Sequence, residues 1–290
     1  MSHLKVSYEV IFKLKSSSVG SSDLLRSILV SWGYNDSDII EQADRKQKWL
    51  SLYCAKPHEV QVVRRRVKKL GLKNVQVHSK TLKAKDWQTV WKKEFKPFTI
   101  SPSMDIVPTW RKGKYRSAKK RIQIYIDTSV AFGTGMHPTT QFMVQFVEKL
   151  KGKCGTVLDI GTGTGILAIA AEKMGAEAVQ AVDISPDAVK IAKENVRMNG
   201  CGSIGVKIAD VKHFAAKERF DLVLANLATD DLIRLKRKIF SLVKKGGYLA
   251  VSGISIPNYQ LLRNAYASLR LRCLKVGKAK GWTAVLFLKP

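Results

Sequence analysis

The sequence contains few cysteines, no long apolar run and few acidic side chains. Its four cysteines are far apart and form no C-x-x-C pair, so neither a disulfide framework nor a metal site is predicted. No segment approaches the run of about 18 apolar residues that a membrane helix needs, and the first residues contain no apolar stretch typical of a signal peptide. We therefore expect a cytosolic protein with reduced thiols and no membrane partner.

The shortage of acidic residues leaves the chain strongly basic. There are 51 lysines and arginines against 23 aspartates and glutamates, which gives a formal net charge of +28. The excess is present both before and after residue 127. Such a surface attracts polyanions, with an affinity that falls as the salt concentration rises. The alternative is a solvated basic surface without a specific partner, because net charge determines association and not fold.

The 290 residues are enough for two domains. Strand-like alternation over residues 5–14, 49–53 and 75–77 is separated by two helical patterns, one starting at Ser22 and one containing Val60, Val63 and Val67. This order predicts a ferredoxin-like α+β domain over residues 1–84. Residues 85–127 are expected to form a linker helix and loop, because an aromatic helical pattern is followed by dense basic residues.

The basic residues at 64–69 surround the valine pattern of the second helix. They have two interpretations, a solvated helix face or a docking face for RNA or an acidic protein. From residue 128 to 290 we expect an α/β domain. Strand patterns at 156–160, 178–182, 204–208, 220–225 and 247–252 alternate with helices, which predicts a parallel sheet covered on both faces. A final pair at 271–276 and 283–288 predicts a hairpin that adds a reversed strand.

A glycine-rich turn follows the first of these strands, in the sequence VLDIGTGTG at residues 157–165. Its glycines, Gly161, Gly163 and Gly165, allow the backbone to come close to a ligand. A dinucleotide fingerprint, G-x-G-x-x-G, would place its third glycine at position 166, which is Ile166 here. The pattern therefore does not favour NAD.

Acidic residues stand on both sides of this turn. Asp159 precedes the first glycine, and it suits a cofactor with an ammonium group and would repel a pyrophosphate. Asp183 ends the next strand, where its carboxylate can accept both hydroxyls of a ribose. Together they predict S-adenosylmethionine as the cofactor, with a turn that binds nothing as the remaining alternative. Asp210 follows a third strand, and it either holds the adenine amino group or caps a helix expected at 211–216.

A further block, AFGTGMHPTT at residues 131–140, lies directly before a helix. Together with the glycine turn, Asp183 and the tripeptide at 225–227, it resembles the bacterial PrmA family, methyltransferases that modify the large-subunit ribosomal protein eleven. The resemblance extends to residues 87–97 and 107–110. It implies the fold of a class I S-adenosylmethionine-dependent methyltransferase, which is Rossmann-like with a mostly parallel seven-stranded sheet. It also implies methyl transfer to lysine and/or N-terminal amines of that ribosomal protein.

The resemblance assigns cofactor contacts to Thr140, Gly161, Asp183 and Asn226, and physical reasoning adds Asp159, Gly163, Gly165 and Asp210 as candidates. We expect Asn226 to orient the acceptor amine and Phe132 to form a wall of the acceptor site. His137 is either a proton acceptor or, as we favour, a residue that fixes the loop. The tripeptide that is usually Asn-Ile-Leu in the family is Asn226-Leu227-Ala228 here, which alters this wall.

Two other functions fit parts of the sequence. A nucleic-acid methyltransferase would suit the positive charge, but enzymes of this fold that act on base amines usually place two prolines and an aromatic residue after the Asn. The residues after Asn226 are Leu227, Ala228 and Thr229 instead. The other candidate is a ribosome- or RNA-binding protein with an inactive methyltransferase domain, which would bind RNA and not the cofactor.

Overall fold

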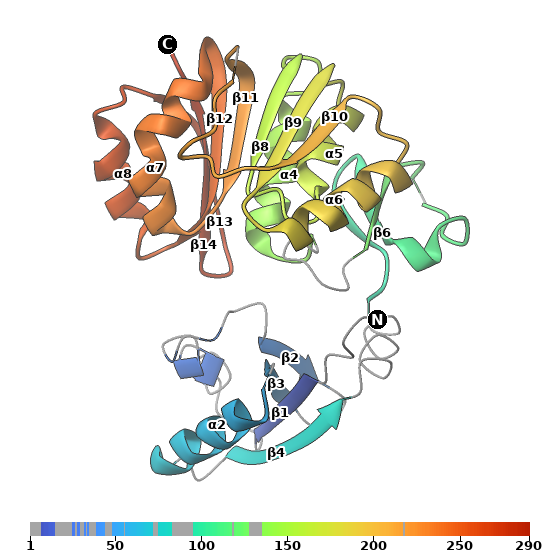
Figure 1. Cartoon of the computed structure of the whole chain (residues 1–290), viewed down its shortest axis with the longest axis vertical. Helices are drawn as coiled ribbons and strands as arrows, with labels where there is room; N and C mark the ends of the chain where they lie inside the picture. The colour runs from blue at the N-terminus through green and yellow to red at the C-terminus, as the bar shows by residue number, and fades with distance from the viewer. Residues whose placement is uncertain are drawn as a thin grey trace. The chain divides into compact units, whose positions relative to one another are not determined.

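The computed structural model describes residues 7–14, 25–26, 28–29, 32, 34, 39–43, 48–54, 56–71, 75–82, 95–117, 119–127, 135–216 and 218–290 (Figure 1). Phe132 and all but the last residue of the helix expected at residues 87–95 lie outside these ranges. The chain forms two compact units, Met1–Glu94 and Phe95–Pro290. All four cysteines are free. Within the described ranges, no helix has the length and apolar character needed to cross a membrane.

The first unit contains a four-stranded antiparallel sheet. Its elements are β1 (Ser7–Leu14), β2 (Ile39–Ala43), β3 (Lys48–Cys54), α2 (Pro57–Lys69) and β4 (Val75–Leu82), and the strand order is β2-β3-β1-β4. This is the ferredoxin-like arrangement that the sequence predicted. The described residues between β1 and β2 include helical positions at 25–26 and 28–29, where the first helix was expected. Strand β2 was not predicted.

Helix α2 lies on this sheet through its valines. Val60, Val63 and Val67 are buried in one apolar cluster with Phe12 and Leu50. The basic side chains are exposed on the rest of the helix, at Arg64, Arg65, Arg66, Lys68 and Lys69. They are accessible to solvent or to a partner, so both interpretations of this face remain open.

The second unit is built on a seven-stranded sheet. Its strands are β8 (Thr156–Ile160), β9 (Ala178–Asp183), β10 (Ile204–Ile208), β11 (Phe220–Asn226), β12 (Val243–Ser255), β13 (Arg272–Ala279) and β14 (Trp282–Leu288). Their order is β10-β9-β8-β11-β12-β14-β13. Neighbouring strands are parallel except around β14, which is antiparallel to both β12 and β13. The mostly parallel sheet and the C-terminal hairpin are therefore confirmed.

Helices cover both faces of this sheet (Figure 1). On one face α7 (Thr229–Leu242) and α8 (Tyr259–Ala267) pack into the main apolar core through Leu232, Ile239 and Leu262. On the other face lie α4 (Pro138–Lys149), α5 (Ile166–Lys173) and α6 (Pro186–Met198). Helix α6 begins as the sequence predicted, because Ser185 caps it by accepting a hydrogen bond from the N–H of Ala188 at 3.3 Å.

Residues 98–126 form a small sheet where the sequence predicted only a linker helix and loop. The strands are β5 (Phe98–Ser101), β6 (Met104–Pro108) and β7 (Ile122–Ile126), and the short helix η2 (Thr109–Arg111) follows β6. β5 pairs with β6 antiparallel, and β6 pairs with β7 parallel. Every residue of β6 is buried, so this strand lacks the alternation that identifies a half-exposed strand. Only the basic stretch between η2 and β7 is an exposed loop.

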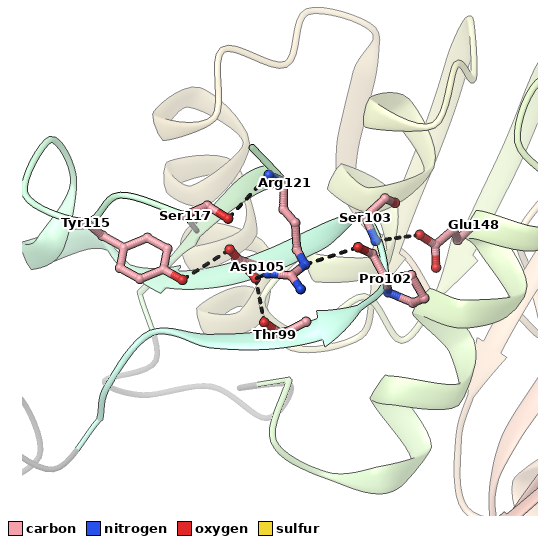
Figure 2. A network of polar contacts seen from close by, with 8 residues as sticks. All are labelled: Thr99, Pro102, Ser103, Asp105, Tyr115, Ser117, Arg121 and Glu148. Atoms are coloured by element: carbon pink, nitrogen blue, oxygen red, sulfur yellow. Dashed lines mark hydrogen bonds and ion pairs between the residues drawn. The ribbon is translucent and has the colours of Figure 1, made fainter. Parts of the chain in front are cut away.

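Asp105 of β6 is the centre of a polar network in this sheet (Figure 2). Its side chain is fully buried and accepts hydrogen bonds from the Thr99 hydroxyl at 2.8 Å and the Tyr115 hydroxyl at 3.1 Å. The Arg121 guanidinium forms an ion pair with the same carboxylate at 3.6 Å. Because Tyr115 lies in the middle of the exposed basic stretch and Arg121 follows it directly, the network fixes that stretch at its middle and at its end.

The small sheet is also fastened to the helices of the second unit. The N–H of Ser103 donates to Oε1 of Glu148 on α4 at 2.8 Å (Figure 2). Asn199, directly after α6, accepts from the N–H of Tyr125 at 2.8 Å and donates to its carbonyl at 2.6 Å. Asn195 accepts from the N–H of Asp127 at 2.8 Å. Residues 95–127 therefore pack on the core of the second unit and do not behave as an independent linker.

Candidate active site

The predicted site residues come together at the carboxyl ends of four neighbouring strands. Asp159 lies next to the end of β8, Asp183 ends β9 and Asn226 ends β11, while Asp210 follows β10. These strands are adjacent and parallel in the order β10-β9-β8-β11, so their carboxyl ends lie on one edge of the sheet. Ligands of open α/β sheets bind at this edge.

The glycine turn uses its glycines in a different way from the one expected. Gly161, Gly163 and Gly165 all have positive φ angles, of 70°, 56° and 81°, which other residues rarely adopt. Their N–H groups, however, bond within the protein. Those of Gly161 and Gly165 donate to the carbonyls of Val182 and Thr162, both at 2.9 Å. The turn therefore does not offer a ligand a set of free N–H donors. A Cβ atom on Gly161 would lie 2.6 Å from Cδ2 of Leu227, and one on Gly165 would lie 3.3 Å from Cβ of Ala192, so packing inside the protein also requires these two glycines.

Asp183 has two contacts that the sequence did not reveal. Its Oδ2 accepts from the N–H of Gly163 at 2.9 Å, and its Oδ1 accepts from the N–H of Ser185 at 2.9 Å. The carboxylate thus ties the glycine turn to the beginning of α6. Each oxygen has a second lone pair, so both can still accept a hydroxyl.

Asp159 is completely buried. Burial raises the pKa of its carboxyl group from 3.8 to about 7, and the Thr162 hydroxyl, which donates to Oδ2 at 2.6 Å, and the backbone of Ala168 partly oppose this rise. The negative charge of Asp183 adds to the rise. Oδ1 has no hydrogen-bond partner in the described part of the chain. A buried carboxyl oxygen without a donor is the arrangement expected when a cationic ligand completes the site.

The start of helix α4 contains three side chains that concern the site, and one of them, Thr139, contacts Asn226. His137 caps the helix, since its Nδ1 accepts from the N–H of Thr139 at 3.4 Å. The Thr139 hydroxyl lies 2.7 Å from the same nitrogen, and Nδ2 of Asn226 donates to this hydroxyl at 3.4 Å. Thr140 is 1% exposed, and its hydroxyl has no partner among the described residues. The loop-fixing interpretation of His137 agrees with this geometry.

Asp210 and Phe132 are the remaining residues that the sequence predicted for the site. Asp210 uses Oδ1 to accept from the N–H of Lys212 at 2.8 Å, which is the capping alternative, and this bond does not test a contact with adenine. Phe132 lies outside the described residues, so its position as an acceptor wall stays a prediction.

Three residues near the site were missed by the sequence analysis. Ile184, directly after Asp183, is 71% exposed although it is large and apolar. A Cβ atom on Gly253 would lie 2.0 Å from the carbonyl oxygen of Leu227, so only glycine allows β12 to pass this close to the end of β11. The third is Thr139, which contacts Asn226. A cofactor motif marks none of these positions, and their effect depends on tertiary contacts.

The sheet order with its single reversed strand, and the acids at the ends of β8 and β9, define the fold and site of a class I S-adenosylmethionine-dependent methyltransferase. Two orphaned buried oxygens, Asp159 Oδ1 and Thr140 Oγ1, fit such a cofactor, which carries an ammonium and a carboxylate at its methionine end. The comparisons with known proteins agree with this class.

The family model described as ribosomal protein L11 methyltransferase (PrmA) matches residues 7–290. The ribosomal protein L11 methyltransferase of Geobacter metallireducens is 37% identical over 209 residues, which are 71% of this chain and 67% of that protein. A solved structure of the ribosomal protein L11 methylase from Lactobacillus delbrueckii subsp. bulgaricus is 31% identical, with a TM-score of 0.63, over 68% of this chain and 100% of that one. The chain belongs to the ribosomal protein L11 methyltransferase (PrmA) family. It is an S-adenosylmethionine-dependent protein methyltransferase.

Proposed function

We propose that this protein transfers methyl groups from S-adenosylmethionine to lysine and/or N-terminal amines of ribosomal protein L11, in the cytosol. The observation that carries the proposal is the gathering of Asp159, Asp183, Thr140 and Asn226 at one sheet edge in a chain of this family. The sequence predicted a division at 1–84, 85–127 and 128–290, and we assign residues 95–127 to the methyltransferase unit because they pack on it. In this scheme the ferredoxin-like unit recognises the substrate protein.

The cofactor contacts follow from the chemistry of each group. Asp183 accepts the ribose hydroxyls on its remaining lone pairs, while Gly161, Gly163 and Gly165 leave room beside it. Asp159 faces the ammonium, and the Thr140 hydroxyl donates to the carboxylate near the N-terminus of α4, where a helix favours an anion. The exposed side chain of Ile184 provides an apolar surface for the adenine ring, and Asp210 accepts from the adenine amino group.

The protein has to deliver a neutral, aligned amine to the cofactor, which supplies a methyl group on a positively charged sulfur. Desolvation and the nearby positive charge both favour loss of the ammonium proton, so the site does not need a strong base. Alignment is then the main task of the side chains. Asn226 accepts an N–H of the amine on its Oδ1, with Phe132 as a wall.

Labelling of a ribosomal extract tests the substrate. Purified protein and labelled S-adenosylmethionine are added to ribosomal proteins from cells that lack this methylation. We expect label in L11, and mass spectrometry of its tryptic peptides then shows whether lysine or the N-terminal amine carries it. Label only in RNA would instead support the nucleic-acid methyltransferase. If nothing is labelled and the purified protein does not bind S-adenosylmethionine, the result would support the inactive RNA-binding protein.

A contact with ribosomal RNA is the second part of the proposal, and the basic loop favours it. We define the basic loop as the exposed side chains Arg111, Lys112, Lys114, Arg116, Lys119 and Lys120. The sequence has no acidic residue from 106 to 126, so no carboxylate in the loop neutralises this charge. The buried Asp105 network fixes the loop at Tyr115, in its middle, and at Arg121, directly after it, which reduces the entropy lost on binding.

Replacing Lys114, Lys119 and Lys120 by glutamine should weaken RNA binding and make it less dependent on salt. Each phosphate contact contributes about 0.9 to the slope of log affinity against log salt on duplex regions, so the slope should fall by about 2 to 3. The matched control replaces the exposed Arg237, Lys245 and Arg263, which lie elsewhere on the same unit. Equal slopes for the two triple variants would show that the loop contributes only general charge.

A further inference from the structure

We propose that Thr139 holds the Asn226 amide in the orientation that presents its oxygen to the acceptor amine. Thr139 is then a positioning residue for methyl transfer, since it acts through Asn226 and does not touch the substrate. The inference rests on the proposed function. It concerns a hydrogen-bonded chain of three side chains, His137, Thr139 and Asn226, in which the last two are 87 residues apart in the sequence.

The imidazole of His137 determines which group donates and which accepts in each of these hydrogen bonds. Nδ1 of His137 accepts from the N–H of Thr139 at 3.4 Å, so in the neutral ring this nitrogen carries no proton. The Thr139 hydroxyl lies 2.7 Å from Nδ1 and therefore donates its only proton to it. The His137 ring is held from the other side by an edge contact with Trp282, with 4.8 Å between the ring centroids.

This use of the hydroxyl proton decides the orientation of Asn226. With its proton given to His137, Thr139 Oγ1 has only lone pairs left and can only accept. The Asn226 amide must turn its NH₂ group toward Thr139, as the 3.4 Å contact from Nδ2 shows. Its Oδ1 is then directed away from Thr139. Because Thr139 is 1% exposed, water does not compete for the hydroxyl.

The orientation matters because an amine has both N–H donors and the lone pair that attacks the methyl group. Oδ1 of Asn226 can accept an N–H and leave the lone pair free, which aligns the nucleophile. A reversed amide would present its NH₂ group and hydrogen-bond the lone pair itself. The wrong orientation would therefore bind the amine and also block its attack, which lowers kcat more than it weakens binding.

The test replaces Thr139 by valine, which keeps the shape and removes the hydroxyl, and by serine, which restores it. We expect Thr139→Val to lower kcat for L11 methylation about 30-fold, with KM for L11 and Kd for S-adenosylmethionine within about threefold of wild type. Thr139→Ser should recover kcat to within about threefold. In the Asn226→Ala background, Thr139→Val should have no further effect on kcat, because its only target is gone.

The neighbouring Thr140→Val is the matched control, and it should weaken cofactor binding instead of lowering kcat. An unchanged kcat in Thr139→Val, or the same loss in the Asn226→Ala background as in wild type, would overturn the inference. So would a serine variant as slow as the valine variant at equal thermal stability. If wild-type protein does not methylate L11 at all, the proposed function fails, and that result is distinct from all of these.

Discussion

Asp183→Ala is expected to lower the affinity for S-adenosylmethionine about 1,000-fold. Hydrogen bonds to an ionised group contribute about 1.5 to 3 kcal/mol each, and the variant loses two to the ribose hydroxyls. It also loses the bonds from the N–H groups of Gly163 and Ser185, so the glycine turn is no longer tied to α6. Isothermal titration calorimetry measures the change directly.

Asp183→Asn separates the two roles of the carboxylate. Its amide keeps one acceptor oxygen, so one backbone bond and one ribose bond can survive, and we expect an affinity between those of wild type and the alanine variant. Asp187→Asn, at an exposed position in the first turn of α6, is the control for removing a negative charge close by. Wild-type affinity in Asp183→Ala would exclude Asp183 from the cofactor site.

Asp159→Asn is expected to make the cofactor-free protein more stable at pH 8 and to weaken cofactor binding at least 10-fold. The pKa of Asp159 is raised from 3.8 to about 7, so between these values the folded state holds a proton that the unfolded state has released. The contribution of this group to the free energy of unfolding therefore falls as the pH rises from about 4 to about 7, and the cost is fully present above that. A shift of about three units corresponds to at most about 4 kcal/mol, and relaxation around the charge should reduce it to about 2 kcal/mol.

Chemical denaturation of both proteins from pH 5 to pH 8 tests this result. The advantage of the variant over wild type should increase from pH 5 to about pH 7, because the folded wild type keeps a proton that its unfolded state has released, and it should then stay constant up to pH 8. Groups common to both proteins cancel in the difference, among them Asp221, whose pKa is lowered mainly by the hydrogen bond from Lys244 against the effect of burial. Parallel stability curves would contradict the assignment of a buried, partly protonated carboxyl group to this position.

If both expectations hold, the protein gives up stability for cofactor binding at Asp159. An asparagine would fill the same space at lower cost in the cofactor-free state, but it could not offer a negative charge to an ammonium group. Strained or destabilising groups are common at functional sites for this reason. The orphaned Oδ1 of Asp159 and the orphaned hydroxyl of Thr140 are two such groups on the same edge of the sheet.

Local patterns in the sequence were sufficient for the main elements of both units. The strands at 156–160 and 204–208 have the expected bounds, and Ser185 caps α6 as predicted. These features depend on hydrophobic period and on side chains within a few residues, which a sequence displays directly. Strand β2 was missed, because its five residues, IIEQA, are too few and too irregular to show an alternating pattern.

The small sheet at residues 98–126 was missed for a different reason. Pro102 and Pro108 and the dense basic residues after Trp110 are typical of loops, while β6 is buried along its whole length and shows no alternation. Its strands exist because β6 pairs with β7 across the intervening basic loop, and because Asn195 of α6 and Asn199 directly after α6 bond the end of β7. Contacts between segments about 70 residues apart have no local signature.

The sequence by itself determined the cofactor motif, the alternation of strands and helices and the family, because each is written in residues that lie close together or in a fixed order. Only the tertiary structure decided what those residues do to one another. It turned the N–H groups of the glycine turn toward Val182, Thr162 and Asp183, and it buried Asp159 far enough to raise its pKa. It also brought Thr139 to Asn226. Hydrogen bonding and desolvation depend on which groups meet in space, and the order of the residues does not record that.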